Sequence, residues 1–355
     1  MFNYPGSIHI HSRYSDGSGD MAEITQAAAS AGLSYIIITD HETLEGLNEE
    51  TIHQGVAVLV GVEINRLHNH YLVLNTEQLI ESNENNPQQL IDAVRNAGGI
   101  GFIAHPFEKG SAYIEKGKAY PWINWPVFHF NGMEIWNYTS HWRGRHPSLI
   151  KTVYSFIFDR KGAMDSPPAD ILKLWDCYTT SGHKVVGIGS TDAHAFNYSI
   201  GFLRVKIFSY KYIFKTIKTY IILGRELSNN FVEAKKQILN ALEAGNCYFA
   251  FDSLYPAKNF NYHAVTEQIK YLPGSTLAYD KDIILIVTSP LKRSVIRMIR
   301  DGKVINQSQS GEMVFQPTTP GVYRVEVFYK PLVGRPRPWI YANPFYLEPS
   351  SGATI

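Results

Sequence analysis

The chain has 355 residues, of which 45% are hydrophobic and 18% are charged. This composition is typical of a folded protein with a large core, and it excludes a largely disordered chain. The 33 basic and 32 acidic residues give a net charge of +1, so the protein lacks the overall positive field that attracts long nucleic acid or an anionic membrane.

The cysteines and the apolar segments indicate the cellular compartment of the protein. Cys177 and Cys247 are too few for a disulfide framework or a thiolate zinc site, and we expect two buried thiols. The N-terminus does not have the basic and apolar regions of a signal peptide. Lysines interrupt the apolar segment at 210–224, which predicts a helix packed on the core rather than a membrane span or a membrane-surface helix. We therefore expect a cytoplasmic protein with no membrane partner.

The first apolar run, SIHIHSRYSDG, contains two histidines two residues apart. Because side chains alternate in a β-strand, His9 and His11 are expected on one side while Ile8 and Ile10 pack inside. Such a pair can bind a metal ion. Two hydrogen-bonded polar residues at a strand end are the alternative.

Up to about residue 200, short apolar runs alternate with helical patterns, which predicts an α/β barrel or a layered parallel sheet. Two helices have clear end signals. One is expected between Asp20 as N-cap and Gly32, and the other begins at Asn86 and Pro87 and ends before Gly98.

Most of the apolar runs end in a residue that can bind a metal. These residues are His41, Glu63, His105, Glu134, Asp192 and His194. Since the C-terminal ends of parallel strands meet on one face, we expect these residues to converge with His9, His11 and Asp16. Each also has a structural alternative, such as a turn for Asp16, a helix cap for Asp192 or a buried hydrogen bond for His105.

The nine candidates mix imidazole and carboxylate groups, which suits zinc, manganese or iron. They are more than one ion can use, so we expect two or three divalent ions, with Glu63 able to bridge. Metal pairs about 4 Å apart can produce hydroxide near neutral pH and can clamp phosphoryl oxygens. The cluster therefore predicts hydrolysis of a phosphate ester.

The remaining segments predict an insertion and a second domain. Long aromatic-rich stretches at about 107–183 indicate an excursion over the mouth of the barrel, which acts either as a functional lid or as a packing layer. A helix is expected at 231–244, closed by Gly245. Beyond it, alternating strands with turns such as Asp301-Gly302 predict an antiparallel β-sandwich.

The motifs HIHSRYSDG, TDHETLEG, GVEI, AHP and STDAH, in this order, resemble those of the PHP (polymerase and histidinol phosphatase) superfamily of metal-dependent phosphoesterases. The resemblance implies a distorted (β/α)7 barrel with a trinuclear centre, and the more acidic ligand set favours manganese or iron over zinc alone. It implies one ion on His9, His11, Glu63 and Asp192, a second on Glu63, His105 and Glu134, and a third on Asp16, His41 and His194. The ending RPRPWIYANPFYL is similar to that of PHP proteins with an extra β-sandwich.

We therefore expect an α/β protein with a PHP barrel at 1–260 and a smaller β-sandwich at 261–355. The expected reaction is hydrolysis of a small phosphate mono- or diester by a metal-bound hydroxide. Arg13 is the first candidate to hold the phosphate oxygens, ahead of Arg143 and Arg145. His194 or His70 is expected to assist the leaving group.

Three alternatives remain open from the sequence. The same site would serve an exonuclease or a phosphotyrosine phosphatase, although the balanced charge makes a long nucleic acid an unexpected partner. The chain would otherwise be a binding module, with a barrel that is only stabilised by metal and a sandwich that recruits a partner. The sequence predicts no particular oligomeric state.

Overall fold

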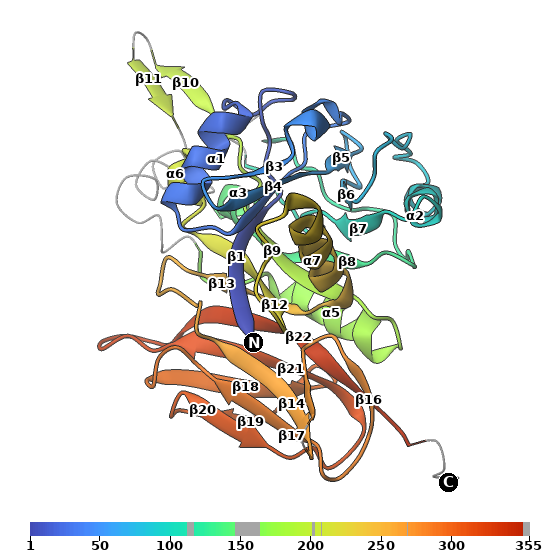
Figure 1. The fold of residues 1–355 in the computed structure, drawn as a ribbon, viewed down its shortest axis with the longest axis vertical. Coiled ribbons are helices and arrows are strands. Elements are labelled where there is room, and N and C mark those ends of the chain that lie inside the picture. The colour runs from blue at the N-terminus through green and yellow to red at the C-terminus, as the bar shows by residue number, and fades with distance from the viewer. Residues whose placement is uncertain (112–116, 146–163, 201–202, 207, 268, 351–355) are drawn as a thin grey trace.

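The computed structural model describes residues 1–111, 117–145, 164–200, 203–206, 208–267 and 269–350 (Figure 1). Parts of the expected aromatic insertion, at 112–116 and 146–163, lie outside these residues. The described chain is a mixed α/β structure, which confirms the predicted class. In its described part beyond residue 245 it contains strands and turns and no helix.

One sheet begins with parallel strands and continues with antiparallel ones. Strands β1, β2 and β4 pair in parallel, β3 lies at the edge, and β12 and β13 follow antiparallel on the other side of β1. Their bounds are β1 (Phe2–Ile8), β2 (Tyr35–Ile38), β3 (Thr51–His53), β4 (Val56–Val60), β12 (Ile217–Leu223) and β13 (Cys247–Phe251).

Another sheet has the order β5-β6-β7-β8-β9. Its strands are β5 (Val62–Ile64), β6 (Tyr71–Leu74), β7 (Ile100–Ile103), β8 (Gly132–Asn137) and β9 (Val186–Ser190). Strands β7, β8 and β9 are parallel, whereas β5, β6 and β7 pair antiparallel. The expected parallel pairing is therefore present for β1, β2 and β4 and for β7, β8 and β9, but not for β5 and β6, which form a hairpin with no helix between them. A separate antiparallel pair joins β10 (Asn197–Ile200) to β11 (Leu203–Lys206).

Three of the helices expected from the sequence, α1 (Met21–Ser30), α2 (Pro87–Asn96) and α7 (Phe231–Ala244), form close to their predicted bounds. The other helices of the described residues are α3 (Tyr138–Gly144), α5 (Ala169–Thr180) and α6 (Tyr210–Ile213), with a 3₁₀ turn at η1 (Glu45–Glu49). Asp20 accepts a hydrogen bond from the Glu23 amide and Glu23 accepts one from the Asp20 amide, which forms a capping box. Gly245 closes α7 with φ 72°, a left-handed conformation that glycine adopts at little cost.

The segment at 210–224 is not the predicted helix. Only the short α6 forms, and the chain then continues as strand β12, because Ile217, Thr219 and Ile221 are β-branched and favour a strand. Lys218 is buried instead of lying in water, and its Nζ lies 3.3 Å from Asp252 Oδ2. Within the described residues, no helix combines the length and the apolar character needed to cross a membrane.

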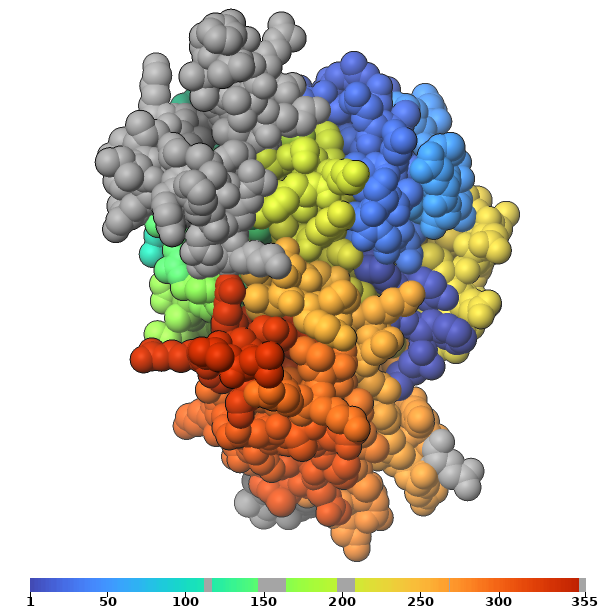
Figure 2. Space-filling view, turned by 90° about the vertical axis from the view of Figure 1, so that its left-hand side faces the viewer, coloured from blue at the N-terminus to red at the C-terminus, as the bar shows by residue number. Residues whose placement is uncertain are grey.

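The C-terminal strands gather at one end of the molecule (Figures 1 and 2). They are β14 (Asn261–Thr266), β15 (Ile269–Tyr271), β16 (Thr276–Ala278), β17 (Ile284–Thr288), β18 (Ser294–Arg300), β19 (Lys303–Ser308), β20 (Glu312–Phe315), β21 (Gly321–Tyr329) and β22 (Arg337–Glu348). The sheet β15-β14-β17-β20 shares a buried core with β18, β21 and β22. Strand β22 also pairs with β13, so hydrogen bonding is continuous between the N-terminal and C-terminal parts.

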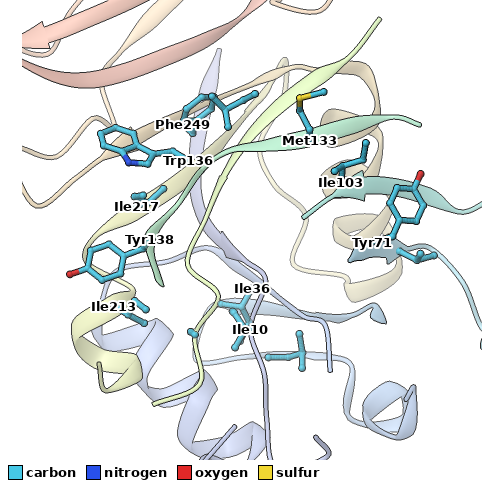
Figure 3. Packing of buried hydrophobic residues seen from close by; sticks show 14 of the residues in the cluster. Ile10, Ile36, Tyr71, Ile103, Met133, Trp136, Tyr138, Ile213, Ile217 and Phe249 are labelled. Carbon is cyan, nitrogen blue, oxygen red and sulfur yellow. The ribbon is translucent and has the colours of Figure 1, made fainter. Parts of the chain in front are cut away.

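The core of the N-terminal part lies directly beneath the first histidines. Ile10, between His9 and His11, is fully buried and lies near Ile36 in this core (Figure 3). Ile8 is buried as well, so the predicted inward packing of both isoleucines is confirmed. Full burial of such a side chain contributes about 1.5–3 kcal/mol, which anchors the histidine segment to the core.

The cysteines differ in exposure, which corrects the expectation of two buried thiols. Cys247 is buried, and burial raises its pKa to about 12, whereas Cys177 is exposed on α5. The thiolate is the reactive form. We therefore expect a thiol reagent at pH 8 to label Cys177 rapidly in the folded protein and Cys247 only after unfolding. Labelling followed by peptide mass analysis measures this, and rapid labelling of Cys247 in the native protein would contradict the structure.

Candidate metal centre

The predicted ligands come together at the ends of the N-terminal strands. His9 and His11 follow β1, His41 follows β2, Glu63 lies in β5, and further candidates follow β7 and β9. Two isolated parallel bridges, between Ile10 and Ala193 and between His41 and Glu63, hold these strand ends next to one another. The convergence expected from the sequence is therefore present in the structure.

The first histidine pair reaches the cluster by a different backbone path from the one expected. Strand β1 ends at Ile8, and His9 has φ 66° instead of an extended conformation. His105 and Asp192 also have positive φ, at 26° and 51°. Such strain costs about 1–3 kcal/mol per residue and is found mostly at functional sites. His9 and His11 nevertheless direct their Nε2 atoms to the same carboxylate oxygen, Glu63 Oε2.

The buried carboxylate of Glu63 is the centre of the cluster. One of its oxygens, Oε1, lies 2.7 Å from His70 Nδ1 and 3.3 Å from His105 Nε2. The other, Oε2, lies 3.0 Å from His9 Nε2, 3.2 Å from His11 Nε2 and 3.4 Å from His41 Nδ1. A single carboxylate thus joins histidines from several strands, as a bridging ligand would.

Two aspartates complete the cluster around this centre. Asp192 Oδ1 lies 3.4 Å from His9 Nε2, 3.5 Å from His11 Nε2 and 3.4 Å from His194 Nδ1. Asp16 lies on the outer side, with Oδ1 3.2 Å from His194 Nε2 and Oδ2 3.9 Å from His41 Nε2. Among the described residues, four overlapping groups have candidate ligand atoms that all lie within 4.8 Å of one another. The groups are His9, His11 and Asp192; His9, Glu63 and His105; His41, Glu63 and His70; and His11, Asp16, His41 and His194.

Buried nitrogen atoms in this cluster test whether these residues fit metal ions. Three buried nitrogens make no hydrogen bond of normal geometry: His11 Nε2 and His41 Nδ1, which lie 3.2 and 3.4 Å from Glu63 Oε2, and His70 Nε2. Leaving such atoms unsatisfied costs about 1–3 kcal/mol each, so their presence needs an explanation. Imidazole nitrogens and carboxylate oxygens are the ligands of zinc, manganese and iron, and the residues therefore fit divalent ions.

Electrostatics also show that the cluster requires positive charge. Burial opposes protonation of His11 and His105, but nearby carboxylates outweigh it and raise their pKa values to about 10 and about 9. Burial likewise favours the neutral acids, yet the surrounding histidines hold the pKa values of Glu63 and Asp192 well below their usual range. At His41 burial wins and lowers the pKa to about 4. The carboxylates therefore stay ionised, and protons or metal ions must balance them.

Glu134 lies behind His9, away from the centre of the cluster. Its Oε1 is 2.7 Å from His9 Nδ1, while Oε2 accepts hydrogen bonds from the His105 amide at 2.7 Å and from Asn137 Nδ2 at 2.9 Å. The His9 atom that faces Glu63 is Nε2, so Glu134 is placed to orient the ring from its other nitrogen. The structure brings His70, and not Glu134, to Glu63 and into the ligand groups.

A comparison with models of known protein families matches residues 7–166 to the PHP domain. The matched residues include the candidate ligands from His9 to Glu134, and Asp192 and His194 follow beyond them.

Three known proteins are similar to the chain. An uncharacterised protein of Methanocaldococcus jannaschii is 25% identical over 114 residues, which cover 28% of this chain and 66% of that protein. A crystallised Bacteroides vulgatus protein, described as a two-domain protein containing a predicted PHP-like metal-dependent phosphoesterase, is 14% identical, with 96% of this chain and 95% of that chain covered and a TM-score of 0.43. An amidohydrolase from Chromobacterium violaceum is 15% identical, with 53% and 87% covered and a TM-score of 0.31.

A cavity of about 430 Å³ opens over the candidate metal ligands. Its wall includes Tyr120, Phe196 and Arg143, which are not candidate ligands. Arg143 Nη1 lies 2.9 Å from Glu108 Oε1, and its Nη2 donates to the Lys118 carbonyl oxygen. The structure does not bring Arg13 to this wall, because its exposed guanidinium pairs with Asp20.

Sequence reasoning missed two buried acids beside the ligands. Glu108 lies with Oε2 3.3 Å from His105 Nδ1, and no motif in the run AHPFEKG distinguishes it. Burial raises the pKa of Glu108. The other is Asp40, whose position directly before the candidate ligand His41 in the run TDH could have indicated a role at the site. Asp40 contacts the loop that carries Asp16.

Proposed function

We propose that the protein is a metal-dependent phosphoesterase that hydrolyses a small phosphate ester. The PHP domain match supports a metal-dependent hydrolase. The observation that carries the proposal is the buried Glu63 carboxylate, which lies 2.7–3.4 Å from histidines of several strands whose nitrogens include unsatisfied ones. A site built only for structure needs about four ligands and is closed, whereas this cluster has more ligands and opens to a cavity.

The proximity of the side chains supports three ion sites. We assign the first to His9, His11, Glu63 and Asp192, the second to Glu63, His70 and His105, and the third to Asp16, His41 and His194. Manganese, iron and zinc all suit these ligands. When bound, such ions lower the pKa of water and offset the charge that develops on a phosphoryl group.

The residues expected to assist the leaving group or to hold the phosphate have different roles in this proposal. His70 and His194, expected from the sequence to assist the leaving group, are assigned here as ligands, because His194 faces Asp16 with Nε2 and Asp192 with Nδ1. Arg143 replaces Arg13 as the candidate to contact a substrate anion, since Glu108 and a carbonyl group fix it at the cavity wall. The cavity volume of about 430 Å³ supports a small substrate.

Finer features of the fold belong to the same proposal. We propose that the strands from β1 to β9 form a distorted, closed (β/α)7 barrel, which the bridges Ile10–Ala193 and His41–Glu63 support by joining both sheets at the cluster. A boundary near residue 260 and a sandwich at 261–355 are also part of the proposal; the C-terminal strands share one buried core, to which β12 and β13 contribute as well. A cytoplasmic location is part of the proposal as well.

The test is hydrolysis of a panel of phosphate mono- and diesters by protein freed of metal and then loaded with Mn²⁺, Fe²⁺ or Zn²⁺. We expect release of phosphate or alcohol only with metal, and loss of turnover in Asp192→Asn. Protein that binds two or more ions and cleaves no ester would overturn the proposal in favour of a metal-stabilised binding module. Cleavage of long single-stranded DNA or of phosphotyrosine peptides alone would redirect it to those substrates.

A further inference from the structure

We propose that Asp40 is a positioning residue, which holds the loop of Asp16 and thereby sets the affinity of the outermost ion of the cluster. This inference rests on the metal sites of the proposed function. Asp40 follows strand β2, is 4% exposed and is not itself a member of any ligand group in the described residues. Asp40 can therefore affect metal binding only through the residues that it contacts.

The carboxylate of Asp40 binds the loop at two residues, Ser12 and Ser15. Its Oδ1 accepts hydrogen bonds from the Ser12 amide at 2.7 Å and from Ser15 Oγ at 2.5 Å, and its Oδ2 accepts one from Ser12 Oγ at 2.6 Å. Hydrogen bonds to an ionised carboxylate are stronger than neutral ones. Ser12 and Ser15 are consequently fixed relative to the end of β2, where His41 is the next residue.

The loop itself is tightly closed. The amides of Ser15 and Gly17 both donate to the Ser12 carbonyl oxygen, at 3.2 and 3.0 Å. A side chain cannot be placed at residue 17, because its Cβ would lie 2.1 Å from the His11 carbonyl oxygen. Asp16 lies between the anchored Ser15 and this glycine, so the position of its carboxylate follows from the position of the loop.

Asp16 depends on this support more than the other ligands do. Its side chain is 52% exposed, whereas that of Glu63 is 1% exposed and that of His9 is fully buried. The core and Glu134 hold the inner ligands, but little packing holds Asp16. Residues that orient a ligand change metal affinity by about 10–100-fold when they are replaced. For Asp40 the loss is expected at the Asp16 site alone.

The experiment is a titration of metal-free protein with Mn²⁺, in which equilibrium dialysis gives the number and the affinity of bound ions. We expect Asp40→Ala to weaken one ion by about 10–100-fold and to leave the others unchanged. Asp40→Asn should restore most of this affinity, since an amide oxygen still accepts from the Ser12 amide and the serine hydroxyls can reverse direction. Such a rescue would show that Asp40 acts by positioning the Asp16 loop and not through its negative charge.

A matched control is Asp252→Ala. Asp252 is also buried, pairs with Lys218 and accepts hydrogen bonds from Tyr220 and from the Ala257 amide, and none of these partners belongs to a ligand group. We expect this variant to lose stability and to keep the Mn²⁺ affinities of the wild type.

Two results would overturn the inference. If Asp40→Ala binds every ion as the wild type does, or weakens all ions to the same extent, Asp40 does not act through the Asp16 loop. Wild-type protein that binds no Mn²⁺ would instead overturn the proposed function, and this inference with it. Circular dichroism of each variant verifies that its Mn²⁺ affinities are those of folded protein.

Discussion

Glu63→Gln is expected to lower kcat/KM for a phosphate ester by more than about a hundredfold and to remove at least one bound ion. The reason is the position of this carboxylate, whose two oxygens face histidines on both sides of the cluster. Glutamine keeps the shape of the side chain but is neutral, and its NH₂ group cannot serve as a ligand. The predicted loss exceeds the 10–100-fold typical of residues that only support a ligand. Elemental analysis and steady-state kinetics measure both effects.

The control for this variant is Glu326→Gln. Glu326 is a buried glutamate paired with Arg324 in the C-terminal strands, so its replacement changes a buried charge without touching the cluster. We expect metal content and turnover to remain at the wild-type level. Glu63→Gln protein that keeps both its ions and its activity would show that Glu63 does not bridge.

His70→Ala and Glu134→Gln are expected to have different effects on metal content. His70→Ala should lose one ion per chain, because His70 faces Glu63 Oε1. Glu134→Gln should retain every ion at saturating metal, with affinity lowered by about 10–100-fold, because its oxygens serve His9 Nδ1, the His105 amide and Asn137.

Metal analysis after dialysis against a defined Mn²⁺ concentration distinguishes these two variants. The reverse pattern, in which Glu134→Gln loses an ion and His70→Ala keeps all of them, would restore the ligand set that the sequence alone implied. Equal losses in both variants would contradict both sets, because each assigns only one of the two residues as a ligand.

Much of the cluster could be predicted because its ligands follow recognisable strands. The apolar runs before His41, His105 and Asp192 all form strands, and the end signals at Asp20 and Gly245 correspond to the observed helix ends. In these segments the local pattern and the global fold favour the same structure.

The sequence predicted His70 at the site but not as a ligand, because its contact with Glu63 depends on a hairpin. Asn65 and Asn69 adopt left-handed φ values of 74° and 56°, and Asn65 Nδ2 donates to the Asn69 carbonyl oxygen. This turn reverses the chain, so that β6 pairs antiparallel with β5 and His70 returns to Glu63. The alternation of runs and helices gave no sign of it. The prediction of a helix at 210–224 was wrong for a similar reason. The spacing of the lysines favours a helix, but pairing of this segment with β1 and β13 stabilises the strand β12.

Metal-dependent hydrolysis is tested most directly by a Mn²⁺ titration of metal-free wild-type protein that records bound ions and ester hydrolysis in the same samples. We expect two to three ions per chain, with hydrolysis appearing as these ions bind. Protein that saturates with one ion or none, or whose hydrolysis does not depend on bound metal, would contradict the proposed metal-dependent phosphoesterase.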